Sequence, residues 1–444
     1  ATSLRIGDVA WGFFPSIQAG WVVTNENWAP KGKNFNYLRL NAGYEVTGND
    51  NINNKAARTS FEVLKFLHNN IPAVQLNNIG NENITYEKTR RFYTGFESQW
   101  LENRLGLDFT FFFNHTTNLL TLKDFTTPVA GVKSYWSNEG SLDNKGVEVH
   151  INGKPIVSRK FTLELGASIG HYLNVIKSLP NNTTLALNGQ ENAAVGYTSS
   201  IYGNQNIATL VNHSAGVFYG YKTAGVFSTD AEAKAAGKDG YLYQVDETGA
   251  KSYFKAGDMH FVDLNGDGII NESDKTIIGD PNPKLYGNFF AHATWGNLTL
   301  SAIFGYSIGN DIYNYQRSIL ESGNNFYNQT SAMTDRWRVE GQITNMPRIS
   351  YGDEMGNSRF SDRWIEDGSY LKLRSLNINY KIPVNSSWLQ GLQVWAEANN
   401  LFTISKYLGG DPEMSVSNAV LYQGIDTGCV SQGRTFTVGV KINL

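Results

Sequence analysis

The sequence contains one cysteine in 444 residues, Cys429, so a framework of intrachain disulfide bonds is excluded. Charged residues make up only 17% of the chain, and a formal net charge of −3 leaves no basic excess of the kind that binds nucleic acid. No run of 18 apolar residues is present, and the sequence therefore offers no candidate for a transmembrane helix. The first residues, Ala1 to Arg5, lack the features of a signal peptide and lead directly into strand-like sequence, so we expect that further chain precedes them.

The residue patterns of the common catalytic sites are also missing. The seven histidines are scattered, none of them pairs with another at the spacing of a metal site, and no HExxH pattern occurs. No GxSxG motif or phosphate-binding glycine loop is present, and no pair of carboxylates is set apart by its surroundings. We therefore expect a protein that is not an enzyme.

What the sequence has in abundance is aromatic residues, at 13%, and strands in which apolar and polar residues alternate. The last stretch, Arg434 to Leu444, is the clearest case, because every second residue from Phe436 onward is apolar and those between are small or polar. An exposed apolar edge of this kind would make a soluble domain prone to aggregation, whereas a closed barrel leaves no edge. The mean hydropathy of −0.34 is compatible with a membrane barrel, since its strands are apolar on one side only.

The same alternating unit recurs along the chain and predicts roughly 12–14 long strands. Many of these segments reach about 9–11 residues, the length that crosses a bilayer, whereas strands of soluble proteins are usually nearer 5–6. The clearest predicted strands cover residues 13–23, 36–48, 105–113, 146–152, 160–173, 285–295, 298–306, 371–382 and 392–400. Two polar stretches lie between them: residues 55–91 indicate a long loop or weak strands, and residues 124–143 indicate another loop.

The two longest excursions from this pattern are residues 177–282 and 307–362. The first has low predicted strand content and contains one short predicted helix, Asp230 to Ala236, which ends at Gly237. Short turns at one end of the strands and long loops at the other are typical of outer-membrane barrels. We therefore expect both excursions to be extracellular loop regions.

Residues Asp263 to Asp274 form the sharpest motif in the sequence. Calcium prefers six to eight oxygen ligands, and a glycine at the sixth position, Gly268, allows the turn that brings them together. The last ligand is Asp rather than Glu and no paired helices flank the motif, so it is not an EF-hand proper. We predict weak Ca²⁺ binding, at about 0.1–1 mM, that stiffens the loop; the alternative is a metal-free loop of Asx-turns. The predicted ligands are Asp263, Asn265, Asp267, Asp274 and the carbonyl of Ile269.

The polar residues that alternate with the apolar residues are expected to form a surface in contact with water. They include Asn41, Glu45, Glu164, Asn377, Asn379 and Lys381. Clustered aromatic residues fit interfacial girdles better than sugar-stacking platforms. Examples of these clusters are Phe92–Tyr93, Tyr135–Trp136 and Trp364.

A series of short motifs follows in a fixed order along the chain. These are residues 11–21, 37–49, 146–148, 219–227, 263–279, 335–337, 370–374, 399–403 and 407–413, which include WGFFPSIQAGW, YGYKTAGVF, YLKLR, NNLFT and YLGGDPE. The ordered set resembles the barrel of SusC/RagA-like TonB-dependent transporters. The resemblance covers essentially all 444 residues.

The resemblance implies an all-β fold, an antiparallel transmembrane β-barrel of about 22 strands. Residues 1–444 would be its C-terminal portion, without the N-terminal plug, the TonB-contacting segment and the first strands. Leu444 departs from the family, in which an aromatic last residue is usual. The location implied is the outer membrane of a Bacteroidetes-like bacterium.

The function implied is active import of large nutrients, with glycan oligosaccharides the first expectation and oligopeptides the second. The implied partners are the plug and remaining barrel of the same transporter, a SusD-like surface lipoprotein, the TonB–ExbB–ExbD complex and outer-membrane lipid. One alternative is a soluble, secreted all-β protein that binds or hydrolyses carbohydrate and carries a structural calcium site. A passive porin is a third hypothesis.

Overall fold

The computed structural model describes residues 12–30, 32–52, 54–66, 71–129, 131–180, 184–238, 240–385 and 388–443. Trp11 and Leu444, which the sequence analysis singled out, lie outside the described residues. The chain divides into two compact units. The first holds residues 1–157, 163–182 and 211–213, and the second holds 158–162, 183–210 and 214–444.

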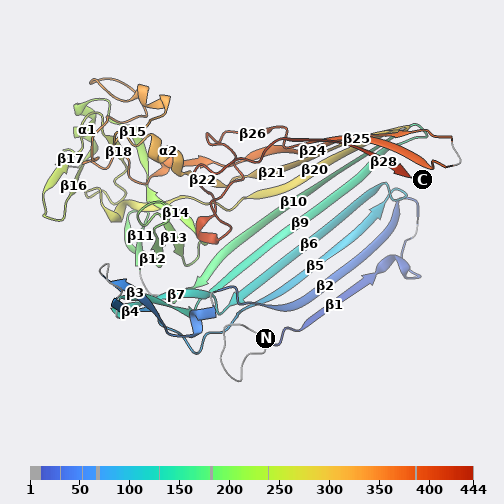
Figure 1. Ribbon diagram of the computed structural model, residues 1–444, viewed down its shortest axis with the longest axis horizontal. Helices are drawn as coiled ribbons and strands as arrows, with labels where there is room; N and C mark the ends of the chain where they lie inside the picture. The colour runs from blue at the N-terminus through green and yellow to red at the C-terminus, as the bar shows by residue number, and fades with distance from the viewer. Residues whose placement is uncertain are drawn as a thin grey trace. The chain divides into compact units, whose positions relative to one another are not determined.

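Long antiparallel strands form most of the first unit. They lie side by side in the order β1 (Ser16–Val22), β2 (Phe35–Asn49), β5 (Glu87–Trp100), β6 (Leu105–Thr117), β9 (Ser141–Val157) and β10 (Phe161–Ser178) (Figure 1). β10 reaches 18 residues, far beyond the usual strand of a soluble domain. These strands confirm the predicted segments and extend several of them.

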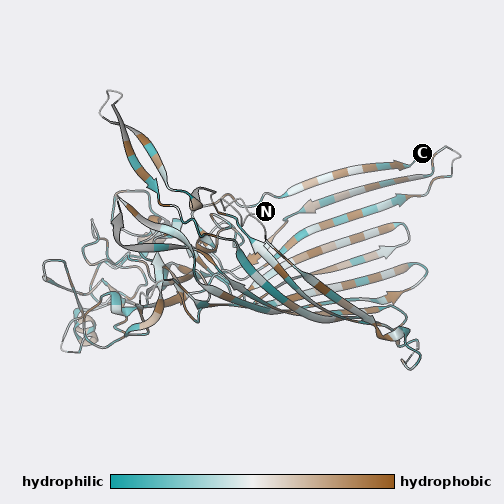
Figure 2. Ribbon diagram, turned by 90° about the horizontal axis from the view of Figure 1, so that it is seen from below, coloured by the Kyte–Doolittle hydropathy of each residue, from teal (hydrophilic) through white to brown (hydrophobic). Residues whose placement is uncertain are grey.

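The register of these strands separates an apolar face from a polar one. Leu40 lies opposite Phe96, and Phe96 opposite Phe109, so apolar side chains share one face. One residue earlier in β2, Arg39 lies opposite Glu97 on the other face. The alternation is visible along the strands in Figure 2. A slip of one residue would exchange the two faces, and the register is therefore strongly specified.

Two hairpins in the first unit bear on the predicted loops: one confirms weak strands within residues 55–91, and the other corrects the loop predicted at 124–143. They are β3 (Ser60–Phe66) with β4 (Ile71–Asn78), and β7 (Leu120–Val129) with β8 (Val132–Asn138). Trp136 packs against a small buried cluster around Ile84, so it lies in a protein core and not in an interfacial girdle. Strand sequences such as LTLKDFTTPV of β7 do not keep a regular alternation of apolar and polar residues, so this period could not reveal them.

The second unit contains another set of long antiparallel strands. They are β20 (Leu285–Trp295), β21 (Leu298–Ile308), β24 (Tyr370–Ile382), β25 (Gly391–Asn399) and β28 (Thr435–Asn443), with the short β26 (Thr403–Ser405) beside β24. Over the described residues, the two sets hold eleven long strands and the three-residue β26, close to the roughly 12–14 long strands predicted.

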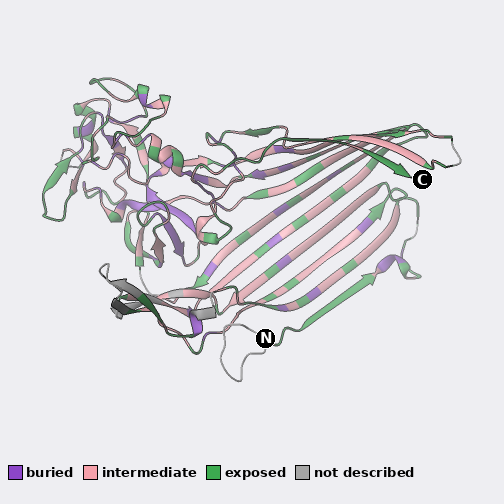
Figure 3. Cartoon of the chain, viewed as in Figure 1, coloured by how far each residue is buried: buried purple, intermediate pink, exposed green. Residues whose placement is uncertain are grey.

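The outermost strand of each set presents an open edge. Among the described strands, β1 pairs with β2 alone and β28 with β25 alone. Both strands are exposed along nearly their whole length (Figure 3). Val438 of β28 keeps 79% of its surface exposed. The apolar side chains of these two strands are therefore not buried in a dry interior.

The excursion 177–282 contains more strands than the sequence predicted. Its largest sheet has five, β11 (Thr184–Leu187), β12 (Gln190–Ser199), β13 (Ile207–Leu210), β14 (Val217–Tyr221) and β19 (Lys275–Gly279). Two hairpin-like pairs follow, β15 (Thr223–Val226) with β18 (Met259–Phe261) and β16 (Tyr243–Val245) with β17 (Lys251–Tyr253). Strands β13 and β14 are buried on both faces, so they lack the alternation that reveals a half-exposed strand.

Helices are few and short in the described residues. Helix α1 (Asp230–Ala236) confirms the prediction, and Thr229 caps it by accepting a hydrogen bond from the Glu232 amide. A second helix, α2 (Tyr315–Leu320), follows β22 (Asp311–Asn314), which pairs with β23 (Ile365–Asp367) and β27 (Ile425–Asp426). Single turns of 3₁₀ helix occur at 23–25, 54–57, 272–274, 331–335, 362–364 and 420–422. No helix in the described part of the chain has the length and apolar character needed to cross a membrane.

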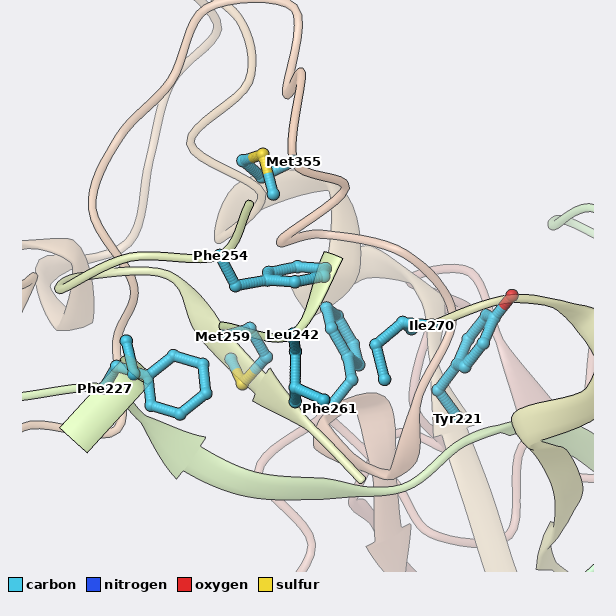
Figure 4. Close-up of a cluster of buried hydrophobic side chains, with 9 residues drawn as sticks. Tyr221, Phe227, Leu242, Phe254, Met259, Phe261, Ile270 and Met355 are labelled. Atoms are coloured by element: carbon cyan, nitrogen blue, oxygen red, sulfur yellow. The ribbon is translucent and has the colours of Figure 1, made fainter. Parts of the chain in front are cut away.

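The two excursions of the second unit share buried cores. Phe227, Phe254 and Phe261 pack together with Met355, which comes from the other excursion (Figure 4). A second cluster joins Phe218 to Tyr313, Trp364 and Ile425. Trp364 is completely buried in this cluster, so the prediction that it belongs to an interfacial girdle or a sugar platform is wrong.

Candidate functional site

The polar faces of the long strands carry the predicted lining residues. In the first unit, Glu45 of β2 pairs with Arg91 of β5 at 3.4 Å, and Arg39 with Glu97 at 3.5 Å. Asn41 lies on the same face of β2, between Arg39 and Glu45. These partly exposed ion pairs add little stability, but they make a strongly hydrophilic surface.

The second unit carries a matching polar face. Asn377 donates a hydrogen bond to Glu397 of β25 at 3.3 Å. Asn379 and Lys381 follow on the same face of β24, opposite Trp395 and Gln393. The remaining predicted lining residue, Glu164 of β10 in the first unit, lies 3.9 Å from Lys154 of β9. The structure therefore places the predicted polar residues on hydrophilic faces of the long strands.

A buried charge cluster joins β24 to the segment between β26 and β28. Lys372, with 2% of its surface exposed, lies 2.6 Å from Glu413 and 3.1 Å from Asp411. Arg374 also pairs with Glu413, and the Tyr370 hydroxyl donates to the same carboxylate at 2.6 Å. Two cations thus face two carboxylates, and this balance is what makes burial of the charges tolerable. We call Lys372, Arg374, Asp411, Glu413 and Tyr370 the β24 clasp.

A second buried carboxylate ties the two excursions together. Asp258 is fully buried and accepts hydrogen bonds from the Arg348 guanidinium at 2.7 Å and the Asn357 amide at 2.9 Å. Its partners are 90 and 99 residues further along the chain. Sequence reasoning missed this network, since no local pattern marks residues so distant in sequence.

The predicted calcium loop is a compact series of turns. The Asp263 carboxylate accepts the amides of Gly266 and Gly268, each at 2.7 Å, and Asp267 accepts the amide of Ile269 at 2.7 Å. Gly268 has φ of 82°, as the turn requires. The Asn265 side chain bonds both the amide and the carboxylate of Asp267.

The remaining predicted ligand, Asp274, is buried beneath this loop. It accepts the amides of Leu264 and Asn271, both at 2.9 Å. Burial raises the pKa of the Asp274 carboxyl, and the negative charges of Asp263 and Asp267 raise it further, against the effect of the two amides. The three carboxylates are thus close enough to interact.

These oxygens match the donor chemistry that calcium prefers. Within the described residues, however, no group of three or more His, Cys, Asp or Glu side chains is arranged to hold a metal ion. The carboxylates are occupied by backbone amides, as in the Asx-turn alternative. Calcium binding therefore stays a prediction.

Known proteins were compared with the chain by sequence and by structure. No family model matches the sequence. The TonB-dependent receptor P3 of Formosa agariphila is 28% identical over 97% of this chain, and the TonB-dependent receptor SusC of Bacteroides thetaiotaomicron is 26% identical over 98%. A solved structure of the RagAB peptide importer superposes with a TM-score of 0.77 and 21% identity over 99% of this chain.

The chain resembles the C-terminal barrel segment of SusC/RagA-like transporters. Its fold, an antiparallel β-barrel portion, is shared with the RagAB structure. The chain spans 42% of the length of the P3 receptor, 40% of SusC and 44% of the RagAB chain.

Two motifs that carried the resemblance meet in this SusC/RagA-like chain. Residues 370–374 (YLKLR) and 407–413 (YLGGDPE) lie far apart in sequence, and together they supply all five members of the β24 clasp. Each motif was visible in the sequence, but nothing in it indicated that the two would join.

Proposed function

We propose that this chain forms part of the wall and the external loops of a TonB-dependent transporter, which imports large nutrients across the outer membrane of a Bacteroidetes-like bacterium. The observation that carries the proposal is the separation of apolar and polar faces along strands of up to 18 residues. One face suits lipid and the other suits water. The curated relatives are TonB-dependent receptors, which supports the same conclusion.

The remaining barrel and the plug are the first proposed partners. Strands β1 and β28 each leave one edge unpaired among the described strands, and closed membrane barrels have no such edge. Strands from the rest of the transporter would satisfy both edges. A SusD-like surface lipoprotein would meet residues 177–282 and 307–362 on the outside, and TonB–ExbB–ExbD would supply energy through the rest of the protein.

The proposed substrate is a glycan oligosaccharide, with an oligopeptide as the second candidate. The second candidate is kept because the RagAB peptide importer shares this fold. The test is uptake of labelled oligosaccharides and peptides by cells that carry or lack the full-length transporter gene. Uptake that persists after TonB is deleted would contradict active import. Steady conductance of the purified full-length protein in a planar bilayer would instead favour a passive porin.

We also propose that Ca²⁺ binds the loop 263–274 through Asp263, Asn265, Asp267, Asp274 and the Ile269 carbonyl. The support is the oxygen-only donor set and the negative charges of Asp263 and Asp267, which act on the buried Asp274 carboxylate. The expected affinity is about 0.1–1 mM. The ion would stiffen the loop and take no part in chemistry.

Removal of calcium from the full-length transporter by EDTA is expected to speed proteolytic cleavage within 263–274 and to leave the barrel intact. The Asp267→Asn variant should be cleaved quickly with or without EDTA, because it loses a ligand charge but can still accept the Ile269 amide. Asp246→Asn is the matched control, since Asp246 closes a similar turn outside the motif by accepting the Thr248 and Ala250 amides. Identical cleavage of wild type with and without EDTA would contradict the proposal.

A further inference from the structure

The second unit contains a hollow of about 430 Å³ that the proposed function does not yet explain. Its lining comes from separate segments of both excursions: the connection between β12 and β13, β14, helix α2, and the 3₁₀ turns at 272–274 and 362–364. Aromatic rings dominate its wall, and they include Tyr202, Tyr221, Tyr313, Tyr315 and Phe360. The hollow therefore combines apolar ring faces with the polar groups between them.

Tyr202 is held at this hollow by an unusual backbone. Its φ is 53°, a left-handed conformation that is costly for a bulky residue, yet its side chain keeps 41% of its surface exposed. The Tyr313 hydroxyl donates to the Tyr202 carbonyl at 2.9 Å. The buried Asn206 side chain closes the loop through two hydrogen bonds with Ile201, at 2.8 and 2.9 Å. Strain maintained by buried bonds in this way is typical of ligand clamps.

The ring of Tyr202 forms an aromatic pair at the hollow. Its centroid lies 4.9 Å from that of Tyr315, with the two planes tilted by 48°. Two electron-rich ring faces set at an angle suit a ligand whose flat side carries weakly positive C–H groups. A pyranose ring has such a side.

The polar groups of the hollow suit hydroxyls. Lys275 is 5% exposed and its ammonium lies 2.8 Å from the Glu272 carboxylate, whose side chain is 69% exposed. An ammonium has three N–H donors, and a carboxylate can accept several hydrogen bonds. After pairing with each other, Lys275 can therefore still donate to a ligand hydroxyl, and Glu272 can still accept from one. The pair is neutral overall and requires no charge on the ligand.

The other cation of the hollow is already engaged. Arg359 lies over the rings of Tyr221 and Phe261, at 5.1 and 4.6 Å. It donates to Gln244 and to the carbonyls of Met355 and Gly356. Its charge is therefore satisfied by protein groups.

We infer that this hollow binds one pyranose ring of an uncharged oligosaccharide. Tyr202 and Tyr315 stack on the ring, and Lys275 with Glu272 bonds its hydroxyls. The inference rests on the proposed import function and adds the location of a sugar subsite in the external loops.

The test uses the full-length transporter in nanodiscs, titrated with maltohexaose, cellohexaose, xylohexaose and mannohexaose. At least one hexasaccharide is expected to bind wild type. Tyr202→Ala and Tyr315→Ala should each weaken that binding by about tenfold, a loss typical of an aromatic contact at the centre of a site. Because the loop is held through the Tyr202 carbonyl and Asn206, removal of the Tyr202 ring leaves those bonds in place.

Two controls separate stacking from general damage. Tyr202→Phe keeps the ring and should bind within twofold of wild type. Tyr351→Ala removes an exposed tyrosine that stacks on Phe326 outside the hollow, and it should bind like wild type. If the alanine variants at 202 and 315 bind and import the sugar normally, this inference fails while glycan import stands. If no hexasaccharide binds wild type, the inference fails; uptake of peptides alone would additionally refute glycan import.

Discussion

The Glu413→Gln variant of the full-length transporter is expected to lose about 3–5 kcal/mol of the free energy that keeps residues 406–432 closed against β24. Glu413 is the shared partner of Lys372, Arg374 and the Tyr370 hydroxyl. Without its charge, two cations would face Asp411 alone in a buried site. Hydrogen exchange of residues 406–432 measures this opening directly.

The matched control is Glu102→Gln. Glu102 pairs with Lys33 at 3.6 Å, but both side chains are exposed, at 56% and 89%. An exposed pair contributes about 0–1 kcal/mol, so this variant should exchange like wild type. Equal behaviour of the two variants would show that the β24 clasp does not hold the segment.

Acidification should loosen the same segment in the wild type. Burial raises the pKa of Glu413, but the bonds from Lys372, Tyr370 and Arg374 outweigh it and hold the pKa below its ordinary value of 4.5. A carboxyl with a lowered pKa in the folded state adds stability above its unfolded pKa, and this stability is lost as the pH falls through the folded value. Protection of residues 406–432 should therefore fall below pH 4.5, and Glu413→Gln should lack this contribution.

The Ile378→Lys variant is expected to be assembled poorly into the outer membrane. Ile378 lies in the middle of β24 with 47% of its surface exposed, on the apolar face between Leu300 and Ala396. A lysine facing lipid near the bilayer midplane costs about 2–4 kcal/mol. The measurement is the amount of full-length transporter in the outer-membrane fraction and its resistance to unfolding in detergent.

The neighbouring residue provides the control for this prediction. Asn379 lies on the opposite, polar face of β24, between Thr299 and Trp395. Asn379→Lys keeps the new charge in water, so it should be assembled in normal amounts. If both lysine variants were assembled equally well, the apolar face would not be the face that meets lipid.

The long strands could be predicted from the sequence because each carries its own evidence. Leu38, Leu40 and Ala42 alternate with polar residues, and that period alone reveals a strand with one wet face. The polar face of the strands could be predicted from the same alternation, and the structure places Asn377 and Asn379 on that face. Helix α1 could also be predicted, because the residues that start, form and end it are adjacent in sequence.

The structure of the two excursions, residues 177–282 and 307–362, could not be predicted from the sequence because it depends on contacts between residues far apart in the chain. Trp364 was predicted at an interface, yet contacts with Phe218 and Ile425 bury it completely. Asp258 and Arg348 form a network only after the two excursions fold together. The aromatic hollow depends likewise on Tyr202 and Tyr315, which are 113 residues apart in the numbering, 315 minus 202.

The shared cores of the two excursions limit how this protein can be re-engineered. Met355 completes a cluster built from residues 221–270, and Phe218 belongs with Tyr313 and Ile425. A chimaera that received only one excursion from a relative would carry half of each interior and expose large apolar side chains. Residues 177–282, 307–364 and 406–432 are therefore best transplanted together as one cassette, and any recombination event that separated them would face the same constraint.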